Sequence, residues 1–325
     1  MIEKITGRRV LFVYSDPAGA KAILSLIYLN RDILSNYLII SDREYDFEVN
    51  FNLTIQKFSN KSVIQWIETL RPEVVVTATS YPGNLELLFV KEATSCNIEV
   101  ISFVDHWTNM KDRFLRDEKF ILPRSVYVID EFAKQIAIDE GLPVSVLQVS
   151  DNPYYTYLKG WKPLRDKSAV LGHLDLPEST NYLLFAPEPL LQFGLQKKYG
   201  FSELDGLNEL IKIIIDQQID RKMRLIIKPH PNHEIDLFNR IELPDFITIA
   251  NKSDYNELAY YSEGILGFFS NSLIEGFFMQ KKIIRILSQI TYPLQDPLIR
   301  WRGFTNCYTE DCVKKKLIEL YDQIS

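Results

Sequence analysis

The chain has 325 residues, of which 46% are hydrophobic and 25% are charged, and its formal net charge is −6. This length favours two domains over a single core, and the composition excludes a disordered or fibrous chain. The negative charge argues against nucleic acid as a partner, because a protein that holds a phosphate backbone needs an excess of Lys and Arg.

The N-terminal segment MIEKITGRRVLFVYSD contains an apolar run that is too short to cross a membrane, and it lacks the cleavage site of a secretory signal. We therefore expect a cytoplasmic protein. Lys4, Arg8 and Arg9 precede the first predicted strand, so peripheral association with the inner face of the membrane stays an open alternative.

Three cysteines, Cys96, Cys307 and Cys312, are an odd number in a chain of this length, and they lack the paired spacing of a metal site. Reduced thiols are the expectation that follows.

In the first half of the chain, short apolar runs alternate with segments of helical periodicity, which predicts a parallel sheet covered by helices. The predicted strands are 10–14, 37–41, 74–79, 99–104, 126–129 and 145–150. The predicted helices are 19–30, 61–70, 84–95 and 131–140. The polar stretch 159–180, broken by Gly and Pro, is expected to be a linker.

The alternation restarts after this linker, which predicts a second domain of the same class. Its predicted strands are 181–188, 224–229, 247–250, 264–269 and 282–287. Its predicted helices are 203–218, 233–240, 254–261, 271–279 and 309–324. The sequence thus predicts an α/β protein with two Rossmann-like domains, residues 1–160 and 161–325.

The segment LIIKPHPNHE, residues 225–234, places Lys228, His230 and Pro231 directly after a predicted strand. Ligands of open parallel sheets bind beyond the carboxyl ends of strands, so these residues are candidates for binding an anion. Alternatively, His230 caps the next helix or bonds a neighbouring carbonyl. His233 and Glu234 are expected to be solvated.

In GILGFFSNSLIEGFF, residues 264–278, a predicted strand leads through Ser270, Asn271 and Ser272 into a predicted helix. The amides of a helix N-terminus and nearby hydroxyls suit the phosphates of a nucleotide, although capping alone would also explain the serines. Glu275, one turn later, is a candidate for a ribose hydroxyl or an exposed helix carboxylate.

The segment ISFVDHWTNMKDRF, residues 101–114, places Asp105 at the end of a predicted strand. A carboxylate at that position is a candidate general base, with His106 and Asp112 in reserve. The alternative is that Asp105 caps the next segment or pairs with Arg113.

Two further strand ends in the first half are candidates for contact with an acceptor. In VYSDPAGAKAIL, residues 13–24, Asp16 and Gly19 stand where small residues let a ligand approach the backbone, or let a helix pack tightly on the sheet. Ser80, in TATSYPGN, has the same status.

Several motifs are missing from the sequence. It contains no Gly-x-Gly-x-x-Gly fingerprint and no Walker-type loop, which argues against hydride transfer and ATP hydrolysis. No Asp-x-Asp triplet is present to bind a divalent metal. We therefore expect neither a cofactor nor a metal.

The order of these segments resembles the GT-B superfamily, whose two Rossmann-like domains face a cleft. The resemblance is carried by KPHP (228–231), by SNS (270–272) with Glu275, by FAPEPLLQFGLQKKYGFSE (185–203), which contains Glu188, and by VSDNPYYTYL (149–158). It is similar both to the branch with a His-Pro motif, as in bacterial sialyl-, Kdo- and glycerophosphate transferases, and to the sugar-nucleotide 2-epimerases.

The resemblance implies an inverting, metal-independent glycosyltransferase that moves a sugar from a CMP- or UDP-linked donor to a glycan or lipid-linked acceptor. Lys228, His230, Pro231, Ser270 to Ser272, Glu275 and Glu188 would bind the donor. Asp105, His106 and Asp112 would then be the catalytic candidates, and Asp16, Gly19, Ser80 and Arg113 would contact the acceptor. The alternatives are a UDP-sugar 2-epimerase or hydrolase of the same fold, and a non-catalytic subunit of a polysaccharide assembly system. The resemblance further implies that the last helix crosses back to the first domain.

Overall fold

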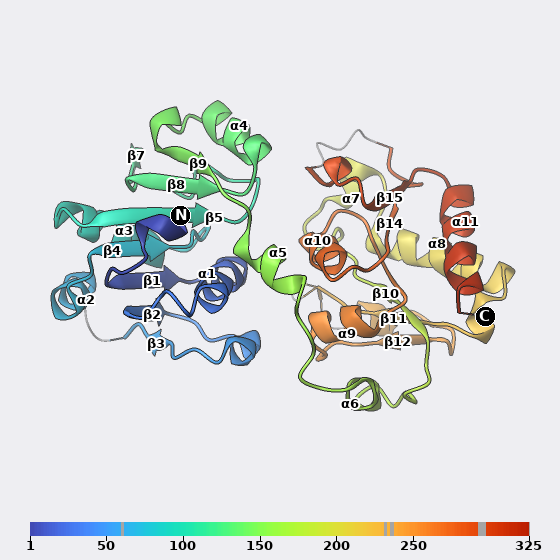
Figure 1. The fold of residues 1–325 in the computed structure, drawn as a ribbon. Coiled ribbons are helices and arrows are strands. Elements are labelled where there is room, and N and C mark those ends of the chain that lie inside the picture. Colours follow the sequence, from blue (N-terminus) through green and yellow to red (C-terminus); the bar gives the residue numbers. More distant parts are fainter. Residues whose placement is uncertain (60–61, 231–232, 235–236, 292–296, 325) are drawn as a thin grey trace. The chain divides into compact units, whose positions relative to one another are not determined.

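A computed structural model describes residues 1–59, 62–230, 233–234, 237–291 and 297–324. Its contacts divide the chain into two compact units, Met1–Tyr157 and Leu158–Ser325, which are called unit 1 and unit 2 below. Each unit is an α/β domain with a parallel main sheet, as Figure 1 shows. The prediction of two Rossmann-like domains is therefore confirmed.

Unit 1 is built on a seven-stranded parallel sheet. In order across the sheet its strands are β3 (Gln56–Lys57), β2 (Tyr37–Ser41), β1 (Val10–Tyr14), β4 (Val74–Thr77), β5 (Glu99–Val104), β8 (Ser125–Val128) and β9 (Leu147–Val149). All five residues of β1 are buried, as expected of a central strand with both faces covered.

The helices of unit 1 are α1 (Pro17–Leu29), α2 (Val63–Leu70), α3 (Leu85–Ser95), α4 (Glu131–Asp139) and α5 (Pro153–Leu158). Helix α2 begins at a capping box in which Ser62 and Gln65 bond each other's backbone amides. Trp66 of α2 and Phe89 of α3 pack with Val13 of β1 in one core cluster. The apolar faces of α2 and α3 therefore cover the same face of the sheet.

Unit 2 is built on a six-stranded parallel sheet. In order its strands are β12 (Ile247–Ile249), β11 (Arg224–Ile227), β10 (Tyr182–Phe185), β13 (Gly264–Gly267), β14 (Ile283–Ile286) and β15 (Phe304–Cys307). The register pairs Phe185 of β10 with Ile227 on one side and with Leu266 on the other. These three strands therefore end at one edge.

The helices of unit 2 are α6 (Lys167–Gly172), α7 (Gln196–Tyr199), α8 (Glu203–Asp216), α9 (Tyr255–Tyr261), α10 (Asn271–Phe278) and α11 (Glu310–Asp322). Val313, Leu317 and Leu320 of α11 join the core of unit 2, where α11 contacts α8, β14 and β15. The closing helix thus buries its apolar face against the core of its own unit. No helix in the described ranges has the length and hydropathy that crossing a bilayer requires.

Several predicted elements differ from the structure. In the predicted helix 233–240, the described residues form only a 3-10 turn at Phe238–Arg240, and residues 235–236 lie outside the described ranges. The expected linker contains α6, which begins at Asp166 with a side-chain cap to Ala169 N. Strand β15 and the hairpin of β6 (Leu115–Arg116) and β7 (Lys119–Phe120) were not predicted, because their sequences are short and polar.

Cys307 at the end of β15 and Cys312 in the first turn of α11 are paired as a disulfide. The expectation of reduced thiols is therefore wrong for these two residues. Their separation of five residues in the sequence is not a pattern from which a disulfide could be predicted. Cys96 is free and exposed.

Candidate functional site at the carboxyl edges of the two sheets

The sheet of unit 2 changes direction at β10. From β10 the chain first adds β11 and β12 on one side, and it then returns to add β13, β14 and β15 on the other. In such sheets the crevice beyond the carboxyl ends of the strands at the change of direction is the usual ligand site. Glu188 follows β10, Ser270 follows β13, and Lys228 and His230 follow β11.

Ser270 is the N-cap of α10. Its Oγ accepts hydrogen bonds from Ser272 N (3.2 Å) and from Ser272 Oγ (2.8 Å). Asn271 is the first residue of α10 and is half-buried, like Ser270 and Ser272. The capping alternative is thus observed, and it leaves this helix N-terminus with the partial positive charge that favours an anion.

His230 lies in a network that holds it near the sheet edge. Its backbone N–H donates to His233 Nδ1 (2.7 Å), and His233 Nε2 lies 3.5 Å from Oε1 of the buried Glu203. Burial lowers the pKa of His230, and the neighbouring His233 and Lys228 lower it further. The imidazole of His230 is therefore neutral at pH 7, where it can donate one hydrogen bond. The expectation that His233 is solvated is wrong, whereas Glu234 is exposed and pairs with Arg240.

Lys228 brings a cation to the same edge. Its Nζ donates to the carbonyl oxygen of Asn251 (3.1 Å), and burial lowers its pKa while the charge of Asp254 opposes that change. Pro231, which was predicted with it, lies outside the described residues.

Glu188 bridges the ends of β10 and β13. Its Oε1 accepts from Phe269 N (2.6 Å), the amide immediately before the Ser270 cap, while Oε2 is buried with no hydrogen-bond partner. Burial raises the pKa of Glu188 to about 8, although the hydrogen bond from Phe269 N and, more weakly, the charge of Arg285 act in the opposite direction. The guanidinium of Arg285 donates to Phe268 O (2.6 Å) and to Asn306 Oδ1 (2.9 Å).

Unit 1 changes direction in the same way, at β1 and β4. Asp16 follows β1, and its Oδ2 accepts from Tyr81 N (3.2 Å) beyond β4. Glu86 of α3 is buried, and its Oε1 accepts from Ser15 N (2.9 Å) and Ser80 Oγ (2.5 Å), while Oε2 has no partner. Burial raises the pKa of Asp16, and it raises the pKa of Glu86 to about 7.

Asp105 and Arg113 form a buried ion pair at this edge, with Oδ1 and Nη1 3.6 Å apart. Arg113 also donates to Thr79 O (2.8 Å), so the alternative of pairing is observed. The charge of Asp105 contributes to the raised pKa of Asp16, which places the two carboxyl groups in one electrostatic neighbourhood. His106 Nδ1 bonds Thr108 Oγ1 (2.9 Å), and burial lowers the pKa of His106.

Two predicted residues of unit 1 have simpler surroundings. A Cβ added at Gly19 would lie 2.6 Å from Ala78 Cβ, so tight packing of α1 on the sheet accounts for this glycine. Asp112 is half-buried, and its backbone oxygen accepts from Arg116 Nη1 (3.2 Å).

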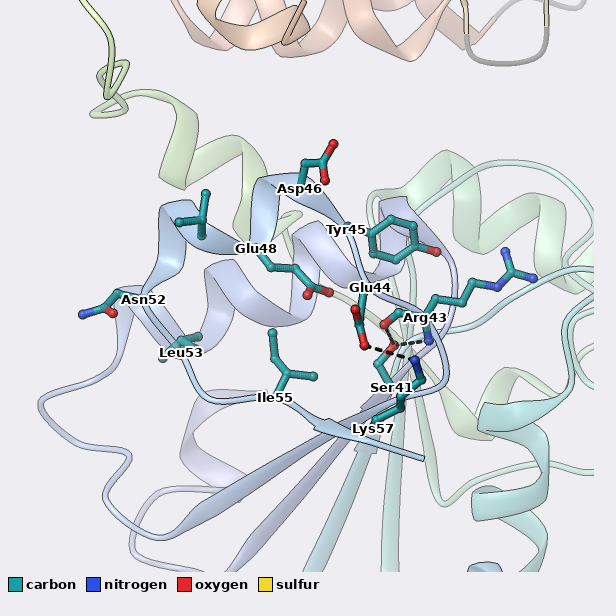
Figure 2. Close-up of a pocket in the computed structure, with 11 residues that line it drawn as sticks. Ser41, Arg43, Glu44, Tyr45, Asp46, Glu48, Asn52, Leu53, Ile55 and Lys57 are labelled. Atoms are coloured by element: carbon teal, nitrogen blue, oxygen red, sulfur yellow. Dashed lines mark hydrogen bonds and ion pairs between the residues drawn. The ribbon is translucent and has the colours of Figure 1, made fainter. Parts of the chain in front are cut away.

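A pocket of about 730 Å³ lies beside this edge of unit 1. Figure 2 shows that Ser41 at the end of β2, Arg43 and Tyr45 line it together with Glu48 of a 3-10 helix (Asp46–Phe51), and that Lys57 of β3 pairs with Glu44 (3.1 Å). This pocket could not be predicted from the sequence, because its lining comes mostly from a loop with neither a motif nor a strong periodicity.

Glu86, Glu203 and His233 are further buried polar residues that the sequence analysis did not select. Only Glu86 had a usable signal, since it shares a helical face with Val90 and Ala93. Glu275 lies on α10, where it was predicted, and is half-buried.

No protein-family model and no curated protein matches this chain. Solved structures match it over nearly its full length. The UDP-GlcNAc 2-epimerase of Methanocaldococcus jannaschii has a TM-score of 0.65 at 15% identity, with 97% of this chain and 92% of that chain covered.

The UDP-GlcNAc 2-epimerase of Neisseria meningitidis, solved bound to UDP-GlcNAc, has a TM-score of 0.64 at 13% identity, with coverage of 97% and 91%. The glycotransferase of kitacinnamycin has a TM-score of 0.59 at 10% identity, with coverage of 97% and 90%. At these identities the likeness shows the fold, two Rossmann-like domains of the GT-B kind.

Proposed function

We propose that this chain is an enzyme that acts on a UDP-linked sugar. Its reaction is either inversion of the configuration at C2 of that sugar, as in a UDP-sugar 2-epimerase, or release of the sugar from UDP, as in a hydrolase. The observation that carries the proposal is the set of groups at the carboxyl edge of the unit 2 sheet. There the capped N-terminus of α10, the neutral His230 and the Lys228 ammonium all lie at the carboxyl edge of three adjacent strands. The fold shared with epimerases, one of them solved with UDP-GlcNAc, supports UDP as the nucleotide.

In this proposal unit 2 binds the diphosphate. The amides of Asn271 and Ser272 and the hydroxyl of Ser270 hold phosphate oxygens, because a helix N-terminus favours negative charge. His230 donates a hydrogen bond from its neutral ring, and Lys228 supplies a positive charge. These fixed donors would also stabilise the charge that develops on UDP when its bond to the sugar breaks. Glu275 is the candidate for the ribose hydroxyls.

Unit 1 supplies the acid and base groups. Inversion at a sugar carbon requires that a proton be removed from one face and returned to the other, so two proton-carrying groups are needed. Asp105, in its ion pair with Arg113, is the candidate base. Asp16, whose pKa is raised by burial, is the candidate acid. Two carboxyl groups with different surroundings are the usual way to obtain both roles at one pH.

Incubation with UDP-N-acetylglucosamine in D2O, without an acceptor, tests the reaction. We expect the C2 epimer or the free sugar with UDP to form. In an inverted product, ¹H NMR should show loss of the H2 signal, because deuterium from the solvent replaces that proton. Asp105→Asn should slow turnover by about 10² to 10⁴-fold, the usual contribution of a general base. Asp117→Asn is the matched control, because Asp117 is exposed and Asn tolerates its left-handed backbone.

A protein that leaves UDP-N-acetylglucosamine unchanged under these conditions would contradict the proposed reaction. If product forms only when a glycan or lipid-linked acceptor is added, the second candidate, glycosyl transfer, replaces it. The pocket of unit 1 favours that candidate, because a polar pocket with a volume of about 730 Å³ could hold an acceptor sugar. Unit 1 would then be the acceptor domain and unit 2 the donor domain. Binding without turnover on any acceptor would indicate a non-catalytic subunit.

A further inference from the structure

Glu188 presents an electrostatic problem for a site that binds an anion. It is an acid at the point where the sheet of unit 2 changes direction, and its Oε1 accepts a hydrogen bond from the amide immediately before the Ser270 cap. An ionised carboxylate can only accept hydrogen bonds, and it repels phosphate. Ionised, it would work against the α10 N-terminus beside it.

The two oxygens of Glu188 have different surroundings. Oε1 is held by Phe269 N at 2.6 Å, whereas Oε2 is buried and has no hydrogen-bond partner. A buried carboxylate oxygen without a partner is costly when it is charged, and the cost falls when the group takes up a proton. Only the protonated form also gives Oε2 an O–H that can donate.

We propose that Glu188 binds the ligand as a neutral carboxylic acid, in which Oε1 accepts from Phe269 N and Oε2–H donates a hydrogen bond to a phosphate oxygen of the nucleotide. This inference rests on the donor site proposed above. It makes Glu188 a ligand-binding residue in its protonated form, and it makes nucleotide affinity depend on pH.

The raised pKa of Glu188, about 8, agrees with this assignment. Other charged and titratable groups lie on the elements around this edge of the sheet, and the effect of each must be separated from that of Glu188 in a test. They are Lys228, His230 and His233 after β11, Glu203 of α8, Glu275 of α10 and Arg285 of β14. Lys228 matters most, because its lowered pKa would also weaken anion binding as the pH rises.

Isothermal titration with UDP at about pH 7 and about pH 9 tests the inference, since the last phosphate proton dissociates near pH 6 and adds little in this range. Affinity should fall about tenfold between the two pH values, because the fraction of protein with a neutral Glu188 falls by that factor. At about pH 8.5, titrations in two buffers of different ionisation enthalpy should show uptake of most of one proton on binding.

The matched variants are Glu188→Gln and Glu178→Gln. The amide introduced by Glu188→Gln keeps one acceptor and one donor without titrating, so this variant should bind UDP with little dependence on pH and take up little proton. Glu178 is exposed and precedes β10, so Glu178→Gln should behave as the wild type. A Glu188→Gln variant that keeps the tenfold fall would assign the effect to Lys228 or another group, and would overturn the inference.

The wild-type protein alone also decides the question if Glu188→Gln does not fold. Tight binding of UDP at pH 7, with no proton uptake at about pH 8.5, would overturn the role of Glu188 and leave the donor site standing. Absence of UDP binding at pH 7 would instead contradict the donor site itself.

Discussion

At the scale of single residues, Glu86 shows how a buried acid couples folding to pH. Burial raises the pKa of Glu86 to about 7, above the value of about 4.3 that is usual for Glu. The folded chain therefore holds this proton more tightly than the unfolded chain. The stability that results is fully present below about pH 4 and is lost as the pH rises through about 7, a total of about 4 kcal/mol.

Replacement of Glu86 by Gln should remove this dependence, because the amide still accepts from Ser15 N and Ser80 Oγ but does not titrate. Between about pH 5 and about pH 8, the free energy of unfolding should change by about 2 to 3 kcal/mol less in Glu86→Gln than in the wild type. Urea unfolding at the two pH values measures the difference. Glu92→Gln, on the same helix and only partly buried, is the control. An identical pH dependence in Glu86→Gln and wild type would mean that this carboxyl does not stay protonated in the folded chain.

Residues that follow strands could be predicted from the sequence, and residues that depend on a distant partner could not. Asp105, Lys228 and Ser270 were selected because each stands where an apolar run ends, which is where parallel sheets bind ligands. Glu86 stands inside a helix, so its role depends on loops after β1 and β4 that only the fold brings to it. The same reason explains why Glu203 was missed, since its partners come from separate loops.

At the scale of elements, helix α1 packs closely on the chain just after β4 because both positions of contact, Gly19 and Ala78, are small. A Cβ at Gly19 would lie 2.6 Å from Ala78 Cβ, closer than any ordinary contact. Gly19→Ala should therefore destabilise the protein by about 1 to 3 kcal/mol, the usual cost of overpacking. Adding Ala78→Gly should recover most of that loss, because it removes the atom that clashes.

Thermal unfolding of the two single variants and the double variant measures this coupling. Gly160→Ala is the control, because an added Cβ at Gly160 meets nothing within 4 Å. If the effects of Gly19→Ala and Ala78→Gly were simply additive, the packing explanation would be wrong, and contact with a ligand would again be the better account of Gly19.

Elements with a strong apolar pattern were predicted, and those set by tertiary context were not. The central strands β1, β10 and β13 are buried on both faces, so they appear in the sequence as continuous apolar runs. Strand β15 reads FTNC and lies at the edge of its sheet, where a polar face is allowed, so its sequence carried no signal. The prediction of a helix at 233–240 was wrong at its start, where the side chain of His233 is buried beside Glu203.

At the scale of the whole molecule, the two units share one feature, a glutamate with a raised pKa at the edge of the sheet. In each unit a glutamate connects the two loops where the strand order changes direction, the buried Glu86 in unit 1 and the half-buried Glu188 in unit 2. Each accepts an N–H through one oxygen and keeps the other buried without a partner. The formal net charge of −6 counts both as ionised. Since burial raises the pKa of both, each of these two sheet edges carries less negative charge at neutral pH than the sequence implies.

Hydrogen exchange of the full chain with and without UDP tests which unit binds the nucleotide. A ligand present at about 100 times its Kd stabilises the folded state by about 2.7 kcal/mol. We expect the largest slowing of exchange at the amides of Ala186, Glu188, Leu190 and Leu191 and at amides 269–272, because these loops follow β10 and β13, whose ends form the proposed site. Amides 41–57, around the pocket of unit 1, should change little. Slowing confined to 41–57 would place the nucleotide in unit 1, and the capped helix α10 would then be a structural feature with no part in binding it.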